Sequence, residues 1–403
     1  MSKVAHTPQL RFPEFSGDWE EKKLSDISDV RDGTHESPKY VLDGFPLITS
    51  KNLLSNGSID FENINLVSEE DYTNINKRSK VDINDILFGM IGTIGNPVIV
   101  KETGFAIKNV ALIKQQKELL NKFMIFYLSG NSIAKQFYIE NTGGTQKFLA
   151  LGVIRSLKIK FPPDTEQQKI AAFLTAVDNK IEQLSKKQAL LGEYKKGLMQ
   201  QIFSQAIRFK ADDGCDFPDW EEKSLGELFN YKNGGSFENE VVKDGLYNLI
   251  TLNSITIDGE LKNEHKKINS FDNSLKINDL IMVLSDVAHG NFLGLTAIIP
   301  EDNSYVLNQR MGALKSKGLN NVVFLRLLIN YNQKYFKLHG QGSSQQNLSK
   351  GDILKFELLL PNRNEQQKIA NFLSSIDTKI EQVGKQLDES KQFKKALLQQ
   401  MFV

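Results

Sequence analysis

Two long segments of the chain carry hydrophobic residues in a seven-residue repeat. In each segment, two interleaved series made mostly of Leu, Ile and Val recur at this spacing. A sustained heptad pattern predicts a helix whose hydrophobic seam packs against a partner helix. The residues that we expect at this coiled-coil interface are Ile170, Leu174, Val177, Ile181, Leu184, Leu191, Leu198 and Ile202 in the first segment, and Ile369, Leu373, Ile376, Ile380, Val383, Leu387, Leu397 and Met401 in the second.

The two segments are copies of one sequence. Residues 166–203 and 365–402 begin EQQKIAAFL and EQQKIANFL and are identical at 20 of 38 aligned positions. We favour an intramolecular pair over helices that each lie on their own domain, because a 38-residue helix is ~57 Å long and exceeds the width of a small domain. Short tethers after Pro162 and Pro361 favour an antiparallel pair. Four polar residues interrupt the seam and are expected to fix its register, namely Gln188, Lys195, Ser390 and Lys394.

The sequences that precede the two helices are also related. WEEK occurs near the start of both, and GGTQKFLALGVI in the first aligns with GSSQQNLSKGDI in the second. Short runs rich in Val, Ile and Leu are separated by Gly, Asn and Pro, and helix-spaced runs follow, which predicts an α/β (α+β) fold. We expect two similar domains separated by the two long helices, with pseudo-two-fold symmetry. The expected boundaries are a first domain at 1–163, a first helix at 164–203, a linker at 204–216, a second domain at 217–361 and a second helix at 362–403.

Length and composition agree with this division. A chain of 403 residues can form two cores, and its 40% hydrophobic and 25% charged residues are typical of globular proteins. The single cysteine, Cys215, fits a reducing compartment and an inert linker thiol. No secretory signal or membrane-length hydrophobic run is evident, so we expect a cytoplasmic protein.

Positive charge is concentrated in corresponding parts of the two halves. The net charge is only +1, yet residues 103–163 contain nine Lys or Arg against two Glu, and residues 303–350 contain seven Lys or Arg and no acidic residue. Such local basic surfaces can bind the phosphates of a nucleic acid even when the whole chain is nearly neutral. The alternative is a solvated surface that happens to be rich in lysine.

The sequence shows no pattern typical of catalysis. It contains no GxxxxGK[ST], HExxH or CxxC, and its five histidines have no metal-ligand spacing, so we expect no catalytic residue and no metal site. FPDWEEK resembles the acidic motif of metal-dependent nucleases, but its acidic residues are too close together to come from two strands. GMIGTIGN could bind a phosphate through backbone amides, or could form a turn or bulge between strands.

As a whole the chain resembles a DNA specificity subunit of a type I restriction-modification system. The resemblance covers nearly its full length and rests on the two FP…WEE openings, the EQQKIAAFL and EQQKIANFL helices, their KKGLMQQIF and KKALLQQMF ends, and DGTHESPKY, ITSKNL, ILFGMIGTIGN and NVALIK in the first half. It implies two target recognition domains that each read half of a bipartite DNA site, held apart by the helices. No counterpart of DGTHESPKY is evident in the second half, which implies half-sites of different sequence.

The resemblance also implies partners and cofactors. Double-stranded DNA, two modification subunits that methylate adenine with S-adenosylmethionine, and restriction subunits that use ATP and Mg²⁺ would assemble with this chain, which would bind no cofactor itself. Two other functions stay open: a structural coiled-coil adaptor that binds DNA without sequence specificity outside a restriction system, and an enzyme acting alone. The absence of catalytic motifs argues against the enzyme.

Candidate DNA contacts follow from residue chemistry. Arg can contact guanine and Asn or Gln can contact adenine through two hydrogen bonds, whereas Lys also suits phosphates. Each candidate could equally be a solvated or turn-forming residue. The candidates are Thr34, His35, Lys51, Asn52, Lys77, Arg78, Lys108, Asn109, Gln146 and Lys147 in the first half, and Asn253, Asn308, Gln309, Arg310, Gln345 and Gln346 in the second.

Overall fold

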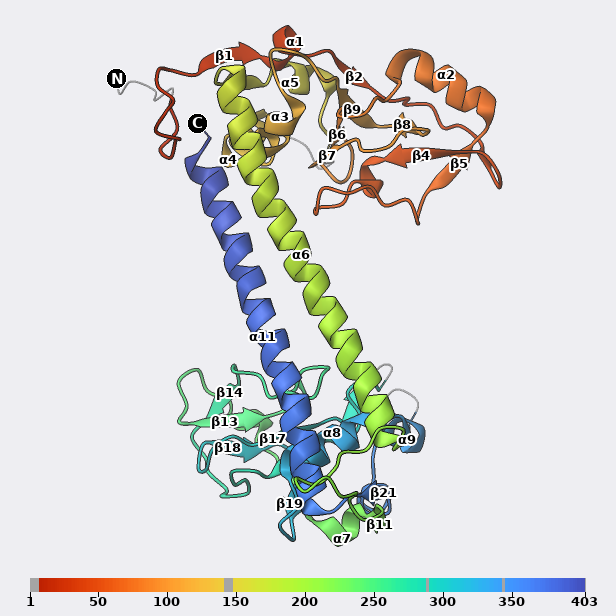
Figure 1. Ribbon diagram of the computed structural model, residues 1–403, viewed down its shortest axis with the longest axis vertical. Coiled ribbons are helices and arrows are strands. Elements are labelled where there is room, and N and C mark those ends of the chain that lie inside the picture. Colours follow the sequence, from red (N-terminus) through yellow and green to blue (C-terminus); the bar gives the residue numbers. More distant parts are fainter. Residues whose placement is uncertain (1–6, 141–147, 288–289, 343–344, 403) are drawn as a thin grey trace. The chain divides into compact units, whose positions relative to one another are not determined.

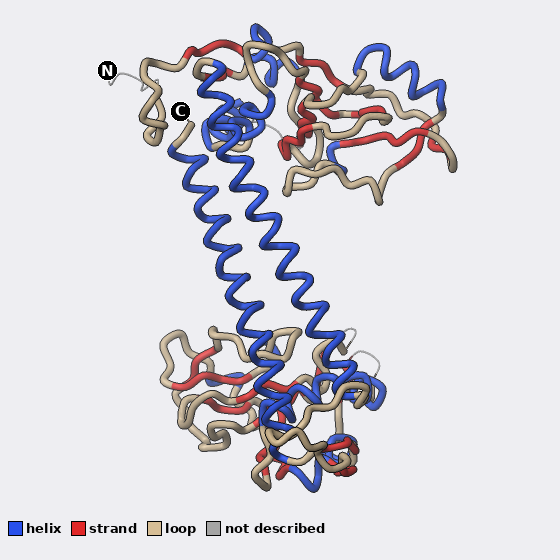
Figure 2. Tube along the Cα trace, in the orientation of Figure 1, coloured by secondary structure: helices blue, strands red, loops and turns tan. Residues whose placement is uncertain are grey.

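The computed structural model describes residues 7–140, 148–287, 290–342 and 345–402. The chain divides into two compact units, here called unit 1 (Met1–Lys187 with Val383–Val403) and unit 2 (Gln188–Gln382). There are two long helices, α6 (Asp164–Phe203) and α11 (Arg363–Gln400). Each of them is divided between unit 1 and unit 2. Figure 1 labels the elements, and Figure 2 shows that each unit combines helices, strands and long loops.

Unit 1 is built on two four-stranded sheets, ordered β2-β9-β6-β7 and β3-β5-β4-β8. The first is antiparallel, and the second contains one parallel pair, β4 with β8. Hydrophobic side chains fill the space between the sheets, and others pack the first sheet against helices. In chain order the elements are β1 (Glu20–Lys23), α1 (Leu24–Ile27), β2 (Val30–Asp32), β3 (Tyr40–Val41), β4 (Phe45–Thr49), η1 (Ser50–Asn52), β5 (Asn65–Val67), α2 (Glu69–Ser79), β6 (Ile86–Gly89), β7 (Gly95–Ile99), β8 (Ala106–Lys108), β9 (Val110–Ile113), α3 (Asn121–Leu128), α4 (Asn131–Glu140), α5 (Leu151–Ser156) and β10 (Lys158–Phe161).

Unit 2 repeats this plan. Its sheets are ordered β12-β19-β15-β17 and β14-β13-β18, and β13 with β18 is again a parallel pair. A two-stranded sheet joins the start and the end of each globular part, β1 with β10 in unit 1 and β11 with β21 in unit 2. In chain order the elements are β11 (Glu221–Ser224), α7 (Leu225–Leu228), β12 (Phe229–Asn233), η2 (Glu238–Glu240), β13 (Tyr247–Ile250), η3 (Leu252–Ser254), β14 (Lys266–Ile268), β15 (Leu280–Val283), β16 (Ser285–Val287), β17 (Thr296–Ile298), β18 (Tyr305–Leu307), β19 (Met311–Ser316), α8 (Val322–Tyr331), α9 (Gln333–His339), β20 (Gln345–Asn347), α10 (Lys350–Leu354) and β21 (Glu357–Leu360).

The long helices pair in opposite directions. In unit 1 the start of α6, at Ile170 and Leu174, shares a core with Leu397 at the end of α11, and in unit 2 the end of α6, at Ile202, shares a core with Ile369 at the start of α11. The expectation of two similar α/β domains with an antiparallel helix pair is therefore confirmed. All sixteen residues proposed for the interface are buried or half-buried, although α11 ends one residue before Met401.

Two of the polar seam residues form matching ion pairs. Lys195 of α6 binds Asp377 of α11 at 2.5 Å in unit 2, and Lys394 of α11 binds Asp178 of α6 at 2.6 Å in unit 1. The repeat is offset by 199 residues, so each lysine corresponds to the other and each aspartate does too. A shifted register would separate both pairs, so they are suited to specify the alignment of the helices.

The repeated EQQ sequence closes each unit. Glu166 has no exposed area and accepts two hydrogen bonds from Arg11, at 2.8 and 2.7 Å. Glu365, equally buried, accepts two from Arg208, at 3.1 and 2.9 Å. Each carboxylate thus ties a long helix to the segment that leads into its globular part.

The first glutamine of the motif is equally constrained. Gln167 Nε2 donates to the carbonyl oxygens of Glu118 and Pro162, and its Oε1 accepts from the backbone N–H of Leu120. Gln366 Oε1 likewise accepts from the backbone N–H of Asn321, before α8, and its Nε2 donates to Asn320 Oδ1 and to the carbonyl oxygen of Pro361. The two helices therefore share this sequence because the same buried polar groups must be satisfied twice.

Candidate nucleic-acid interface

In unit 1 the loop after β2 crosses the connection between β8 and β9. The N–H of Gly33 donates to Val110 O at 2.9 Å, the N–H of Thr34 donates to Ile107 O at 3.0 Å, and the N–H of Asn109 donates to Thr34 O at 3.1 Å. A Cβ atom on Gly33 would lie 2.3 Å from Ile107 O. Glycine is therefore required for the two backbones to approach so closely, and this contact brings Thr34, His35 and Asn109 together.

Ser50 links this crossing to two further loops. Its hydroxyl donates to Asn109 O at 2.8 Å and accepts from the N–H of Met90 at 3.1 Å, at the tip of the β6–β7 hairpin. Asn96 of the same hairpin donates to Leu53 O at 2.8 Å. Four segments distant in the sequence therefore meet at one edge of the two sheets.

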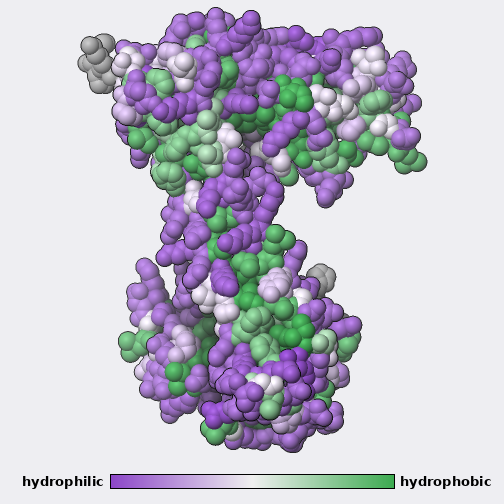
Figure 3. Space-filling view, viewed as in Figure 1, coloured by the Kyte–Doolittle hydropathy of each residue, from purple (hydrophilic) through white to green (hydrophobic). Residues whose placement is uncertain are grey.

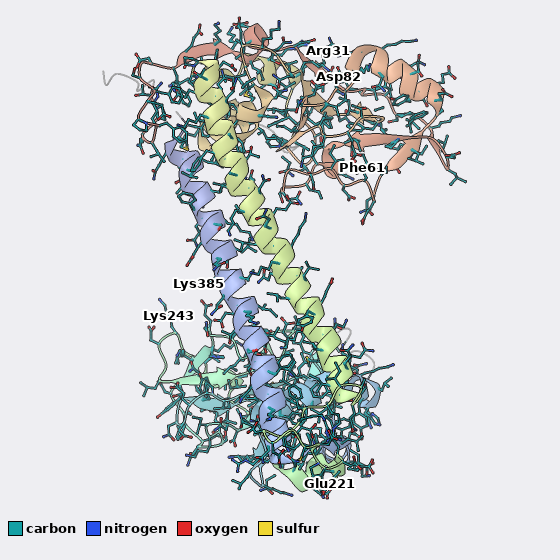
Figure 4. The ribbon with its side chains drawn as sticks, in the orientation of Figure 1. Arg31, Phe61, Asp82, Glu221, Lys243 and Lys385 are labelled. Atoms are coloured by element: carbon teal, nitrogen blue, oxygen red, sulfur yellow. The ribbon has the colours of Figure 1, made fainter. Side chains whose placement is uncertain are left out.

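The short helix η1 presents Lys51 and buries Asn52. The Oδ1 atom of Asn52 accepts from the N–H of Thr49 at 2.9 Å, and Nδ2 donates to the carbonyl oxygen of Asn63 at 2.9 Å. Phe61, labelled in Figure 4, packs edge-on against Phe105 at 6.0 Å between ring centroids and anchors the same loop. The structure thus gives Asn52 a role in holding the loop, whereas the neighbouring side chain of Lys51 is exposed.

His35 lies in a polar cluster with Asp32, Arg78 and Asn109. Its Nε2 is 2.8 Å from Asp32 Oδ2, and its Nδ1 is 2.8 Å from Asn109 Oδ1. Asp32 is buried and also binds the guanidinium of Arg78, whose side chain is 66% exposed. The hydrogen bond to Asp32, followed by that to Asn109, raises the pKa of His35 above its ordinary value.

The other candidates of unit 1 have varied surroundings. Lys77 is exposed on α2 and donates to Asn74 Oδ1 at 2.9 Å, and Lys108 donates to Ser37 Oγ at 2.9 Å. Gln146 and Lys147 lie outside the described residues. Figure 3 shows a mostly hydrophilic surface over unit 1, with smaller hydrophobic patches. Thr34, His35, Lys108 and Asn109 therefore lie together at the crossing. Ser50, which binds Asn109, places the adjacent Lys51 close to them, whereas Lys77 on α2 is not part of the crossing.

Unit 2 contains the same crossing built from a different sequence. Gly235 N–H donates to Leu307 O at 2.9 Å, and a Cβ atom on Gly234 would lie 2.0 Å from Asn308 O. The segment NGGS, from Asn233 to Ser236, therefore takes the place of DGTH in unit 1. The second half has no evident sequence counterpart of DGTHESPKY, yet its backbone forms the same crossing, with Ser236 at the position of His35.

The short helix η3 likewise matches η1. Ser254 Oγ accepts from the N–H of Thr251 at 3.0 Å, as Asn52 does from Thr49. Asn253 is exposed at the position of Lys51. The two units thus hold the same short helix with a buried polar residue and present different side chains on it.

The remaining candidates of unit 2 divide into buried and exposed residues. Asn308 is buried, and its Nδ2 donates to Glu238 Oε2 at 2.7 Å. Gln309 and Arg310 are exposed in the connection between β18 and β19, which corresponds to the β8–β9 connection of unit 1. Gln345 donates to Ser285 Oγ at 2.6 Å.

Gln346 is half-buried on β20, which pairs with β16 next to the β15–β17 hairpin. This strand corresponds to the region of Phe148 in unit 1, which forms a bridge with Ile91 of the β6–β7 hairpin. The exposed candidates of unit 2 are therefore Asn253, Gln309 and Arg310.

Sequence reasoning missed three residues that organise these loops, namely Asp32, Ser50 and Glu238. Asp32 and Ser50 lie inside the DGTHESPKY and ITSKNL motifs, but their partners Arg78 and Asn109 are distant in the sequence. Glu238 binds Asn308 and Lys266, and the ion pair with Lys266 is the main cause that lowers the pKa of Glu238. No local pattern marks such long-range pairs.

The described part of the chain contains no candidate metal-binding group and no candidate membrane-spanning helix. No group of three or more His, Cys, Asp or Glu there could hold a metal ion, and no helix there is long and apolar enough to cross a membrane. GMIGTIGN forms the β6–β7 hairpin, with a register shift before Gly89 and a positive φ at Gly92 and Gly95, which favours the turn interpretation. Cys215 is an exposed free thiol.

Comparison with known proteins identifies the same architecture elsewhere. Residues 16–191 and 218–389 each match the family model described as "Type I restriction modification DNA specificity domain". The chain is 24% identical to the type I restriction enzyme MjaVIII specificity subunit of Methanocaldococcus jannaschii, over 96% of this chain and 92% of that protein.

Two solved structures share the fold. One is the crystal structure of a type I restriction-modification system S subunit from M. genitalium, with a TM-score of 0.61 and 17% identity over 98% of this chain and 99% of that one. The other comes from work on complex assembly and conformational transition of the type I R-M system, with a TM-score of 0.60 and 16% identity over 94% and 96% of the two chains. The duplicated fold is thus common to distant sequences.

Proposed function

This chain belongs to the type I restriction modification DNA specificity family, and from this premise we propose that each of its units binds one half of a bipartite DNA site. It is a specificity subunit and is not itself catalytic. The activity proposed for it is sequence recognition on behalf of a restriction-modification complex.

One observation carries the proposal: the two units hold equivalent loops with equivalent backbones and expose different side chains on them. Lys51 in unit 1 corresponds to Asn253 in unit 2, and the Lys108–Asn109 connection corresponds to the one that exposes Gln309 and Arg310. Different hydrogen-bonding groups on one scaffold suit two DNA half-sites of different sequence. Exposed Lys, Arg and Asn side chains also suit phosphate contacts, which position a protein on DNA.

The partners follow from the same premise. We infer that two modification subunits dock on the paired helices and that restriction subunits join them, so that S-adenosylmethionine, ATP and Mg²⁺ are bound by the partners. Tyr194 of α6 and Phe393 of α11 support this inference, because they occupy the same position of the repeat and are 56% and 52% exposed. Exposed aromatic side chains are common anchors of protein–protein interfaces. Duplicated anchors suit a partner that binds twice.

Half-site assignment can be tested by mutating corresponding positions. The chain is co-expressed with its modification subunit, and the modified sequence is determined by genome-wide methyladenine sequencing. We expect Lys51→Ala to relax the sequence of one half-site and Asn253→Ala to relax the other. The control is Lys77→Ala, on α2 outside the loop crossing, which should leave the motif unchanged. A motif without two separated halves would contradict the proposal, as would relaxation of the same half by both variants.

The long helices are proposed to set the gap between the half-sites. At 1.5 Å per residue, the 40 residues of α6 extend ~60 Å, against ~34 Å for a turn of DNA. Inserting four residues into both helices adds ~6 Å and should widen the gap by about one or two base pairs. The same insertion placed after Cys215, in the linker, should leave the gap unchanged. An unchanged gap in the helix variant would show that the length of the helices does not set the distance between the half-sites.

A further inference from the structure

We propose that His35 is a positioning residue for base recognition in unit 1, where it acts as an imidazolium that turns the amide group of Asn109 so that its NH₂ faces the DNA. The inference rests on the proposed function and adds to it the kind of base edge that Asn109 contacts.

The ring of His35 lies between two oxygen atoms. Both of its nitrogens face oxygen atoms at 2.8 Å, Asp32 Oδ2 at Nε2 and Asn109 Oδ1 at Nδ1. A carboxylate oxygen and an amide oxygen can only accept, and a neutral imidazole carries only one N–H group. With the amide oxygen of Asn109 at Nδ1, only the imidazolium can donate to both oxygens, so this orientation of the amide corresponds to the protonated ring.

The charges around the ring come from three elements. Asp32, on β2, is 5% exposed and favours the proton, whereas Arg78 on α2 binds the same carboxylate and opposes it. Lys108, on β8, binds Ser37 Oγ, and Glu36 is the exposed neighbour of His35 in its own loop. The direct hydrogen bond to Asp32 outweighs the more distant Arg78, in agreement with the raised pKa of His35.

The backbone of Asn109 is fixed by its neighbours. Its φ is 55°, its N–H donates to Thr34 O at 3.1 Å, and its carbonyl oxygen accepts from Ser50 Oγ at 2.8 Å. The remaining choice is which end of the side-chain amide faces His35. The structure places the amide oxygen at Nδ1 of His35, which suits the imidazolium, and the NH₂ group then points away from the ring. A neutral ring that keeps its proton on Nε2 for Asp32 would accept from the NH₂ instead, and the amide would turn over.

The consequence is a donor directed at the base. In the major groove, acceptors are offered by guanine at O6 and N7, by adenine at N7 and by thymine at O4, whereas cytosine offers only an amino donor. Below the pKa of His35, Asn109 should therefore contact an acceptor such as guanine. Above it, this preference should be lost, since the amide oxygen is then presented. Unit 2 has Ser236 at the position of His35, so its half-site should show no such pH dependence.

The test has two measurements on the full chain. First, the five histidines are labelled with ¹³C, and the His35 signal is assigned by its loss in His35→Gln; we expect its midpoint above 6.5, the ordinary histidine value. Second, the chain assembled with its modification subunit is titrated with duplexes carrying the cognate sequence or a single base change in either half-site, from pH 6 to pH 9. We expect discrimination in the half-site of unit 1 to fall about tenfold as pH rises, the size expected for one good base contact.

Two variants separate the outcomes. His35→Gln should bind DNA with a flat pH profile, because glutamine does not titrate, and His339→Gln, which alters an exposed histidine of unit 2, should keep the wild-type profile. A His35 signal that is neutral at pH 6, or a His35→Gln profile like that of the wild type, overturns the inference. Absence of any bipartite sequence preference at every pH would instead overturn the proposed function, and the labelled histidine would still report the charge of the ring.

Discussion

Replacing Glu365 by glutamine tests the buried ion pair that closes unit 2. The carboxylate has no exposed area and accepts three hydrogen bonds, two from Arg208 at 3.1 and 2.9 Å and one from Trp220 Nε1 at 3.1 Å. Glu365→Gln keeps the shape of the side chain, removes its charge and replaces one acceptor oxygen by an NH₂ donor. At least one donor of Arg208 or Trp220 then loses its partner.

The expected cost follows from those bonds. A hydrogen bond to a charged group contributes about 1.5–3 kcal/mol, and breaking a buried ion pair by removing one partner costs up to about 5 kcal/mol. Because the side chain of Arg208 is 25% exposed and can recover some hydration, we expect unit 2 to lose about 2–4 kcal/mol. Glu166→Gln should cost unit 1 about 1 kcal/mol less, since Glu166 accepts no bond from Trp19.

The two tryptophans of the chain allow each unit to be followed separately. Trp19 is buried in the core of unit 1 and Trp220 in that of unit 2. In a Trp19→Phe background, fluorescence during urea unfolding reports unit 2, and in a Trp220→Phe background it reports unit 1. We expect Glu365→Gln to lower the midpoint seen by Trp220 and Glu166→Gln to lower the midpoint seen by Trp19.

The control is Asp219→Asn, which removes an exposed carboxylate 3.6 Å from the same guanidinium and should leave the midpoint unchanged. If Glu365→Gln changes the stability of unit 2 by less than about 0.5 kcal/mol, the buried pair does not hold the helix to its unit, and the explanation given for the repeated EQQ sequence fails.

Three further predictions concern the helices and the loops. Lys195→Glu should destabilise unit 2 by about 0.5–1 kcal/mol in urea unfolding, and adding Asp377→Lys to the same chain should restore the lost stability. If the losses of the two single variants simply add in the double variant, this ion pair does not specify the register. Gly33→Ala should lower the melting temperature of unit 1, because the added Cβ would clash with Ile107 O. The control Gly192→Ala lies in open space on α6 and should raise the free energy of unfolding by about 0.5–1 kcal/mol. Equal changes in stability for the two variants would show that no close backbone contact depends on Gly33. Asn52→Ala should speed hydrogen exchange at the backbone amide of Thr49, and unchanged exchange would show that the side chain does not hold η1.

The sequence predicted the features that repeat locally. The heptads around Ile170 and Ile369 located both long helices and their partner faces, because a seven-residue period is visible without knowledge of the fold. The antiparallel direction followed from the short tethers. The α/β class followed from short hydrophobic runs separated by turn residues, although such runs do not reveal which strands pair.

The candidate site was predicted only in part, for a physical reason. Lys51 and Asn52 are adjacent polar residues in one motif, yet one is exposed and the other supplies the cap of its own short helix. Whether a polar side chain faces solvent or a partner distant in the sequence depends on contacts such as that of Asn308 with the carboxylate of Glu238, 70 residues away. Residue type alone indicates what a side chain can bind, and it does not indicate whether the fold already uses that capacity.

The NGGS loop shows how the two units can diverge in recognition and keep one fold. The close crossing requires only that a glycine stand at the contact, and both Gly33 and Gly234 meet that requirement. The cap of the short helix requires only a polar acceptor, and Asn52 and Ser254 both supply one. These requirements fall on buried or half-buried positions, so they do not constrain the exposed side chains beside them. Substitution at exposed positions such as that of Lys51 is therefore expected to leave the fold and its stability unchanged, whatever the side chain contacts.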